Sequence, residues 1–246
     1  MTISAEKLAL VIPTLNEAGN VRPLLDRIIA ALTPLELDYE LIVVDDDSQD
    51  ETGENVLSYA KQGHGQVRLL VRKGQRGLAG AVIHGWNHTD ATLLGVIDAD
   101  LQHPPEVLPL LLEQIVAGKD IAIASRYVDN QEDSVGEWSK IRQWISRLST
   151  WATAPLQRKE VRIKDPMSGF FVVRRECIDG IDLQPQGFKI LLEILVKGRI
   201  RTAAEVPFHF ATRVSGQSKA SVKVAFHYFS LLGKLSRYAF FGSERQ

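Results

Sequence analysis

The sequence predicts an α/β fold in which a mostly parallel central sheet is flanked by helices. Short apolar runs alternate with amphipathic helical patterns over residues 8–126, as in parallel strands joined by crossover helices. The apolar runs are nearly continuous, which is typical of strands buried on both faces. With 246 residues, of which 45% are hydrophobic, the chain can bury one large core.

The strands and helices of this first part follow from spacing. An apolar run over residues 8–12 ends at Pro13, and apolar side chains then recur at helical intervals over residues 21–29. The same reading gives strands over 40–44, 67–71, 92–97 and 120–125, and helices over 51–62, 76–86 and 106–116.

The alternation stops after Arg126. A helix over residues 137–157 holds three of the four tryptophans, with lysines and arginines between them. This composition suits a helix in a membrane interface, and equally an amphipathic helix packed on the core. We expect a strand over 168–173, a helix over 187–197 and a strand over 203–208, in one domain (1–218) followed by a helical C-terminal appendage (219–246).

Composition excludes several classes of protein. A net charge of −1 argues against a nucleic-acid-binding surface. The single cysteine, Cys177, cannot form an internal disulfide and fits a reducing compartment. No signal peptide is apparent, and no uncharged apolar run approaches the ~20 residues that cross a bilayer. We therefore expect a cytosolic protein, or one that lies on a membrane without spanning it.

The chemistry of the chain centres on Asp98, Asp100 and Gln102, which follow the strand over residues 92–97. Two carboxylates and an amide this close together offer the oxygen ligands that hard divalent cations prefer. An aspartate pair can also cap a helix, and Pro104 stands where one could begin. On these residues alone, both a Mg²⁺ or Mn²⁺ site and a helix cap are open.

Four polar clusters follow predicted strands, at residues 13–17, 45–48, 98–102 and 125–126. Parallel strands bring such clusters to one edge of the sheet, where open α/β sheets bind ligands. Oxygen ligands for a metal, acidic groups for a ribose or base and arginines for phosphates together suit a nucleoside diphosphate. The sequence contains neither a Gly-x-Gly-x-x-Gly motif after the first strand nor a Walker A motif.

Five ordered motifs resemble the polyprenol (dolichol) phosphate mannosyltransferases of family 2 glycosyltransferases, which have the GT-A fold. The motifs are Pro-Thr-Leu-Asn-Glu at 13–17, Val-Val-Asp-Asp-Asp-Ser at 43–48, Asp-Ala-Asp-Leu-Gln-His-Pro-Pro-Glu at 98–106, Ser-Arg-Tyr at 125–127 and Arg-Val-Ser-Gly-Gln-Ser-Lys at 213–219. The resemblance covers residues 8 to 220. Glucosyl-transferring relatives share most of these motifs. The motifs therefore indicate the family more specifically than they indicate which sugar is transferred.

The resemblance implies a donor site for a nucleotide sugar. Pro13, Glu17, Val44 and Asp46 would hold its base and ribose, and Leu15 stands where the family often has tyrosine. Asp98 and Ala99 would contact the nucleotide sugar, while Asp100 and Gln102 would bind a cation bridging its phosphates. Arg213 and Lys219 would neutralise the departing diphosphate.

The resemblance also implies a lipid phosphate as acceptor. Arg126, Arg142 and Ser146 would bind its phosphate, with Arg142 and Ser146 in a Trp-x-x-x-Arg-x-x-x-Ser pattern that begins at Trp138. A phosphate monoester is largely ionised near pH 7, since its second pKa is ~6, so inverting transfer to it needs no general base. Asp165 would contact the sugar, organise the site or form a turn.

The expected activity is metal-dependent, inverting transfer of mannose from GDP-mannose to a polyprenyl phosphate. We expect it at a membrane surface, on the cytosolic face. The alternatives are transfer of glucose from UDP-glucose and a non-catalytic nucleotide-sugar-binding subunit. A complete short form, a form anchored by a membrane subunit and a piece of a longer protein all fit the sequence.

Overall fold

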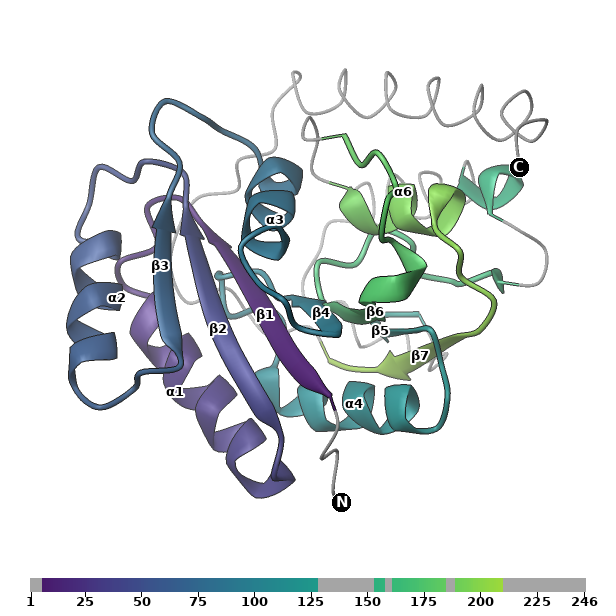
Figure 1. Ribbon diagram of the computed structural model, residues 1–246, viewed down its shortest axis with the longest axis horizontal. Coiled ribbons are helices and arrows are strands. Elements are labelled where there is room, and N and C mark those ends of the chain that lie inside the picture. The colour runs from purple at the N-terminus through teal and green to yellow at the C-terminus, as the bar shows by residue number, and fades with distance from the viewer. Residues whose placement is uncertain (1–5, 128–152, 158–160, 185–188, 210–246) are drawn as a thin grey trace.

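A computed structural model of the chain describes residues 6–127, 153–157, 161–184 and 189–209 (Figure 1). In this part of the chain, a seven-stranded sheet lies between two layers of helices. The strands are β1 (Lys7–Thr14), β2 (Asp38–Asp45), β3 (Val67–Val71), β4 (Leu93–Val96), β5 (Ile121–Ser125), β6 (Phe171–Arg174) and β7 (Ala203–Pro207). The α-helices are α1 (Val21–Leu32), α2 (Thr52–Lys61), α3 (Leu78–Trp86), α4 (Leu108–Val116) and α6 (Ile190–Lys197).

The strand order is β3-β2-β1-β4-β6-β5-β7. β6 runs antiparallel to both of its neighbours, β4 and β5, while the other pairs are parallel. Because β4 and β5 both oppose β6, they point in the same direction. The carboxyl ends of β1, β2, β3, β4, β5 and β7 therefore share one edge of the sheet.

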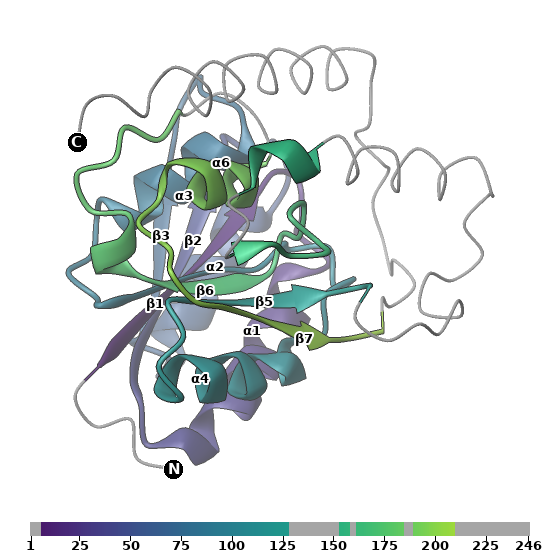
Figure 2. The same cartoon turned by 90° about the vertical axis from the view of Figure 1, so that its right-hand side faces the viewer.

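The helices bury the two faces of the sheet in separate cores. Buried side chains of α1, α2 and α4 pack on one face, in a cluster that includes Leu10, Leu25 and Leu111. Those of α3 and α6 pack on the other face, in a cluster that includes Val11 and Ile194. Figure 2 shows α1 and α4 below the sheet and α3 and α6 above it. Successive residues of β1 thus enter opposite cores, because side chains alternate along a strand.

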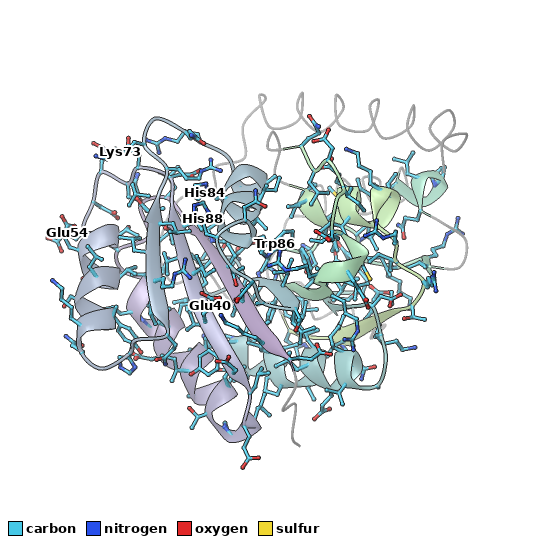
Figure 3. All side chains as sticks on the ribbon, in the orientation of Figure 1. Glu40, Glu54, Lys73, His84, Trp86 and His88 are labelled. Atoms are coloured by element: carbon cyan, nitrogen blue, oxygen red, sulfur yellow. The ribbon has the colours of Figure 1, made fainter. Side chains whose placement is uncertain are left out.

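Trp86 fastens the end of α3 to the middle of the sheet (Figure 3). Its indole Nε1 donates to the Gly95 carbonyl at 3.3 Å, and its ring meets Phe171 edge to face with centroids 6.2 Å apart. A buried indole usually finds both an apolar surface and an acceptor in this way. The contact ties α3 to β4, the strand that leads into Asp98.

The predicted α/β class is confirmed, and each strand predicted from an apolar run is present. The strand predicted over 168–173 is β6, which reverses the direction of its neighbours, and the helix predicted over 187–197 starts at Ile190. Of the helix predicted over 137–157, residues 137–152 lie outside the described residues, and Ala154–Leu156 is a 3-10 turn. The appendage over 219–246 also lies outside them. No helix in the described ranges is long and apolar enough to cross a membrane.

Candidate functional site

The loops after β1, β2, β4 and β5 lie at one edge of the sheet, as their sequence positions predict. Figure 3 shows the two ends of the strands: Lys73, in the loop after β3, is far from Glu40, which lies near the start of β2. Three non-glycine residues in these loops have a positive φ: Asn16 (55°), Asp47 (60°) and Leu101 (60°). Backbone strain of this kind is concentrated at functional sites. This edge therefore has the backbone conformations that are typical of a functional site.

The loops after β1 and β2 form one hydrogen-bonded unit. The Thr14 hydroxyl donates to Asp45 Oδ1 at 3.0 Å, and the Asn16 amide donates to the Ser48 hydroxyl at 2.8 Å. The Glu17 amide donates to the Thr52 hydroxyl at 2.9 Å. Pro13 and Val44 are register partners in β1 and β2, so the structure brings Pro13, Leu15, Glu17 and Val44 to the same part of the edge as Asp46. Asp45 itself acts as a turn residue in this unit.

Asp46 is buried in an ion pair that sequence reasoning missed. Arg72 Nε lies 2.9 Å from Asp46 Oδ1, and the Gly77 amide donates to Oδ2 at 2.7 Å. Burial raises the pKa of Asp46, against the lowering effects of Gly77 and Arg72. Gly77 has φ +130°, a conformation that side chains rarely adopt, and it caps the start of α3. Because Arg72 directly follows β3, the rule applied to the other strand ends would have found it.

The loop after β4 alternates between the core and the surface. Ala99 and Leu101 are buried, whereas Asp98, Asp100 and Gln102 are partly exposed. The backbone N–H of Gln102 donates to Asp100 Oδ1 at 3.1 Å, which tightens the turn around Leu101. The loop therefore places the two carboxylates and the amide on its accessible side.

The donor set fits a divalent cation that is shared with a ligand. No group of three His, Cys, Asp or Glu side chains arranged to hold a metal occurs among the described residues. Magnesium is commonly bound by only one or two carboxylates, with substrate phosphates and water completing its shell. Asp98, Asp100 and Gln102 supply oxygen ligands of this kind, so these residues fit a cation bound together with a diphosphate.

Asp98 packs against two residues that sequence reasoning did not select. A Cβ at Gly169 would stand 2.2 Å from Asp98 Oδ2, so the carboxylate occupies the space that any other residue's side chain would need. His103 Nδ1 lies 3.8 Å from the same oxygen, and its ring packs on Phe170 and Phe208 with centroids 6.0 and 5.3 Å away. Burial lowers the pKa of His103 to about 4, so the imidazole is neutral at pH 7.

Arg126, at the end of β5, is held by Asp165. Its Nε and Nη2 donate to Asp165 Oδ2 and Oδ1, each at 2.8 Å. Asp165 is fully buried, and its own amide and that of Lys164 donate to the Glu205 carboxylate at 3.0 and 2.8 Å. Of the three roles left open for Asp165, the structure supports an organising one, since its carboxylate fixes the plane of the guanidinium.

The structure brings together the predicted residues after β1, β2, β4 and β5, but four predicted site residues lie outside the described residues. These are Arg142, Ser146, Arg213 and Lys219. The described part of the edge combines a polar pair of loops, oxygen ligands suited to a cation and an arginine fixed by a buried carboxylate. Such an arrangement offers ligands for a divalent cation and, at Arg126, a cationic group beside them.

Known proteins with similar sequences are glycosyltransferases. The glycosyl transferase family 2 model matches residues 9–181. The chain is 42% identical over 232 residues to a dolichol-phosphate mannosyltransferase of Pyrococcus furiosus, covering 94% of this chain and 64% of that protein. It is 36% identical over 248 residues to a dolichol-phosphate mannosyltransferase of Mycosarcoma maydis, covering 97% of this chain and 82% of that protein. The chain thus spans less than two thirds of the Pyrococcus relative.

A solved structure with low sequence identity to this chain has the same fold. Glucosyl-3-phosphoglycerate synthase from Mycobacterium tuberculosis, in complex with Mn²⁺, UDP-glucose and phosphoglyceric acid, matches with a TM-score of 0.67. The match covers 94% of this chain and 81% of that chain at 19% identity, so it concerns the fold alone. The chain belongs to glycosyl transferase family 2 and has the GT-A fold that its motifs implied.

Proposed function

We propose that this chain transfers a hexose from a nucleotide sugar to a polyprenyl phosphate, with inversion at the anomeric carbon. The proposed substrates are GDP-mannose and a dolichyl- or undecaprenyl-type phosphate. The observation that carries the proposal is the position of Asp98, Asp100 and Gln102 between two other sets of loops. The β1 and β2 loops lie on one side of this group in the sheet order, and Arg126 lies on the other.

The β1 and β2 loops are proposed to hold the nucleoside. Pro13, Leu15, Glu17 and Val44 would surround the base and ribose, and Asp46 would complete this subsite. Arg72 and Gly77 hold the Asp46 carboxylate in place, so Asp46 would act from a fixed position rather than as a mobile side chain. Leu15 provides apolar contact without a tyrosine's hydroxyl or ring.

The β4 loop is proposed to hold the diphosphate. A divalent cation, Mg²⁺ or Mn²⁺, bound to Asp100 and Gln102 would offset negative charge on the diphosphate. Asp98 and Ala99 would lie against the sugar nucleotide, with the Asp98 carboxylate held against Gly169 and His103. Arg213 and Lys219, which lie outside the described residues, would add positive charge as the nucleoside diphosphate leaves.

The acceptor is proposed to be its own nucleophile. A phosphate monoester is largely ionised near pH 7, so one of its oxygens can attack the anomeric carbon as the bond from that carbon to the diphosphate oxygen breaks. Arg126, with Arg142 and Ser146, would orient the phosphate for attack in line with the leaving group. Asp98, Asp100 and Asp165 would then have no role in removing a proton from the acceptor.

The names of the two curated relatives support this choice of sugar and acceptor, since both are called dolichol-phosphate mannosyltransferases. A lipid acceptor implies work at a membrane surface, and we propose peripheral association with the cytosolic face. The predicted interface helix (137–157), the appendage (219–246) or a membrane-anchoring subunit would provide the attachment. Glucose from UDP-glucose is the alternative donor, because the motifs do not separate the two sugars.

The test is a transfer assay with radiolabelled GDP-mannose or UDP-glucose, a polyprenyl phosphate, and either Mg²⁺, Mn²⁺ or a chelator. We expect label to enter the lipid fraction from GDP-mannose only when the divalent cation is present. Transfer from UDP-glucose instead would replace the donor and leave the reaction type intact. Absence of transfer from both donors, with binding of either one, would favour a nucleotide-sugar-binding subunit.

A further inference from the structure

We propose that Lys189 is a further cationic contact for the acceptor phosphate, on the same side of the β4 loop as Arg126. This inference rests on the proposed function, since it names a further residue of the same acceptor site. It uses a side chain that none of the sequence motifs selected.

Lys189 is held at the site by the segment that also holds Asp98. It is the residue before α6, and its Nζ donates to the Met167 carbonyl at 3.2 Å. Met167 lies in the turn between Asp165, which binds Arg126, and Gly169, which packs on the Asp98 carboxylate. One short turn therefore contacts all three charged side chains, Asp98, Arg126 and Lys189.

The electrostatics of Lys189 place its ammonium among these groups. Burial and, less strongly, the positive charge of Arg126 lower the pKa of Lys189 to about 8, while Asp98 and Asp165 act in the opposite direction. The fold thus keeps two cations, Lys189 and Arg126, together with the carboxylates of Asp98 and Asp165 in one part of the site.

The order of the strands indicates which of the two substrates Lys189 would meet. The loops of β1 and β2, proposed for the nucleoside, lie on one side of β4. Arg126 at the end of β5 and Met167 before β6 lie on the other side. Lys189 therefore belongs to the half of the edge that faces away from the nucleoside loops.

The balance of charge points to the same ligand. The donor diphosphate would share its charge with the cation at Asp100 and Gln102. The bidentate pair with Asp165 already matches the charge of Arg126, so a phosphate dianion needs further positive charge, which Lys189 would supply together with the proposed Arg142. A lysine is a compact charge with three donors on a flexible stem, which suits a phosphate oxygen that moves as it attacks.

The competing interpretation is that Lys189 only anchors the turn through Met167. The variant Lys189→Gln separates the two roles, because glutamine keeps an N–H donor for the Met167 carbonyl and removes the charge. Lys189→Arg keeps the charge. Lys197→Gln is the matched control, since Lys197 ends the same helix and its Nζ contacts Glu193 and the Asp182 carbonyl instead.

The experiment measures the dissociation constant of farnesyl phosphate by calorimetry, and the KM of this acceptor and of the nucleotide sugar in the transfer assay. We expect Lys189→Gln to weaken farnesyl phosphate binding by about tenfold or more, the scale of one lost charged hydrogen bond. Its KM for the nucleotide sugar should stay within about twofold of wild type. Lys189→Arg should bind more tightly than Lys189→Gln, and Lys197→Gln should match wild type.

Acceptor binding by Lys189→Gln equal to that of wild type would overturn the inference, as would an equal loss in Lys197→Gln. If wild type binds and transfers normally while Lys189→Gln does too, only the role of Lys189 fails. If wild type binds farnesyl phosphate without transferring sugar, the proposed function fails and the dissociation constants still decide the role of Lys189. If wild type binds no farnesyl phosphate, both are contradicted.

Discussion

Gly169 lies directly against the carboxylate of Asp98. A Cβ at Gly169 would stand 2.2 Å from Oδ2, 2.8 Å from Oδ1 and 2.6 Å from Cγ of Asp98. Real Cβ atoms essentially never come so close to another heavy atom. The absence of a side chain at residue 169 therefore sets the position of the first carboxylate of the β4 loop.

Replacing Gly169 with alanine should displace the Asp98 carboxylate and slow transfer on the order of a hundredfold, the cost of a small misplacement in an active site. The rate is measured at saturating donor and acceptor. Gly65→Ala is the matched control, because a Cβ there meets nothing within 4 Å. A Gly169→Ala enzyme as fast as Gly65→Ala would show that the position of Asp98 does not matter.

The buried pair of Asp165 and Arg126 should carry more stability than the exposed pair of Arg27 and Glu106. Both are bidentate, but Asp165 is fully buried while the Glu106 side chain is 57% exposed. Removing one charge of a buried pair costs about 3–5 kcal/mol, against about 0–1 kcal/mol for an exposed pair. Urea unfolding of Asp165→Asn and Glu106→Gln compares them. Equal losses of unfolding free energy would contradict the structure.

Lys189 should make the stability of the protein rise with pH in the alkaline range. Its pKa is about 8 in the folded chain, lowered by burial and by Arg126, against 10.5 in the unfolded chain. Between these values the unfolded state binds more protons, so raising the pH favours folding. The contribution of this group is complete above pH 10.5 and lost as the pH falls through about 8.

The measurement is the free energy of urea unfolding of wild type and Lys189→Gln across that range. The difference between them, wild type minus variant, should grow as the pH rises from about 8 to about 10.5. A difference that stays constant across the range would mean that Lys189 is not buried among charges as described.

Cys177 should be unreactive in the folded protein. The thiol is buried, with 4% of the residue exposed, and burial raises its pKa to about 11. Since the thiolate is the reactive form, about one thiol in a thousand is reactive at pH 8 even before access is considered. A disulfide reagent such as DTNB should label the native chain slowly and the urea-unfolded chain at once. Equal rates in the two states would contradict the burial of Cys177.

Patterns within single segments predicted the strands and their common edge. The apolar runs before Asp46, Asp98 and Arg126 each form a strand that ends where its polar cluster begins. Apolar periodicity carries no information about strand direction, so the reversal of β6 could not be read from residues 168–173. It does not disturb the edge, because β4 and β5 both oppose β6 and so point the same way.

The residues that sequence reasoning missed, and the role of Asp165 that it left open, depend on partners that are distant in sequence. Arg72 pairs with Asp46 across 26 residues, and Asp165 binds Arg126 across 39. His103 could have been noted beside Gln102, but its contact with Phe208 depends on the arrival of β7. Gly169 and Lys189 gain meaning only once the turn before β6 is folded against Asp98. Local sequence patterns predict where strands end. Which other residues complete the site depends on tertiary contacts, which these patterns do not predict.

The most direct test of the proposed chemistry is the rate of sugar transfer from GDP-mannose to a polyprenyl phosphate by Asp100→Ala, with Mg²⁺ or Mn²⁺ present. Asp38→Ala is the control, since Asp38 is an exposed aspartate at the opposite end of the strands. We predict that Asp38→Ala keeps the wild-type rate and that Asp100→Ala loses metal-dependent transfer. Transfer by Asp100→Ala at the wild-type rate would contradict a cation held by the β4 loop.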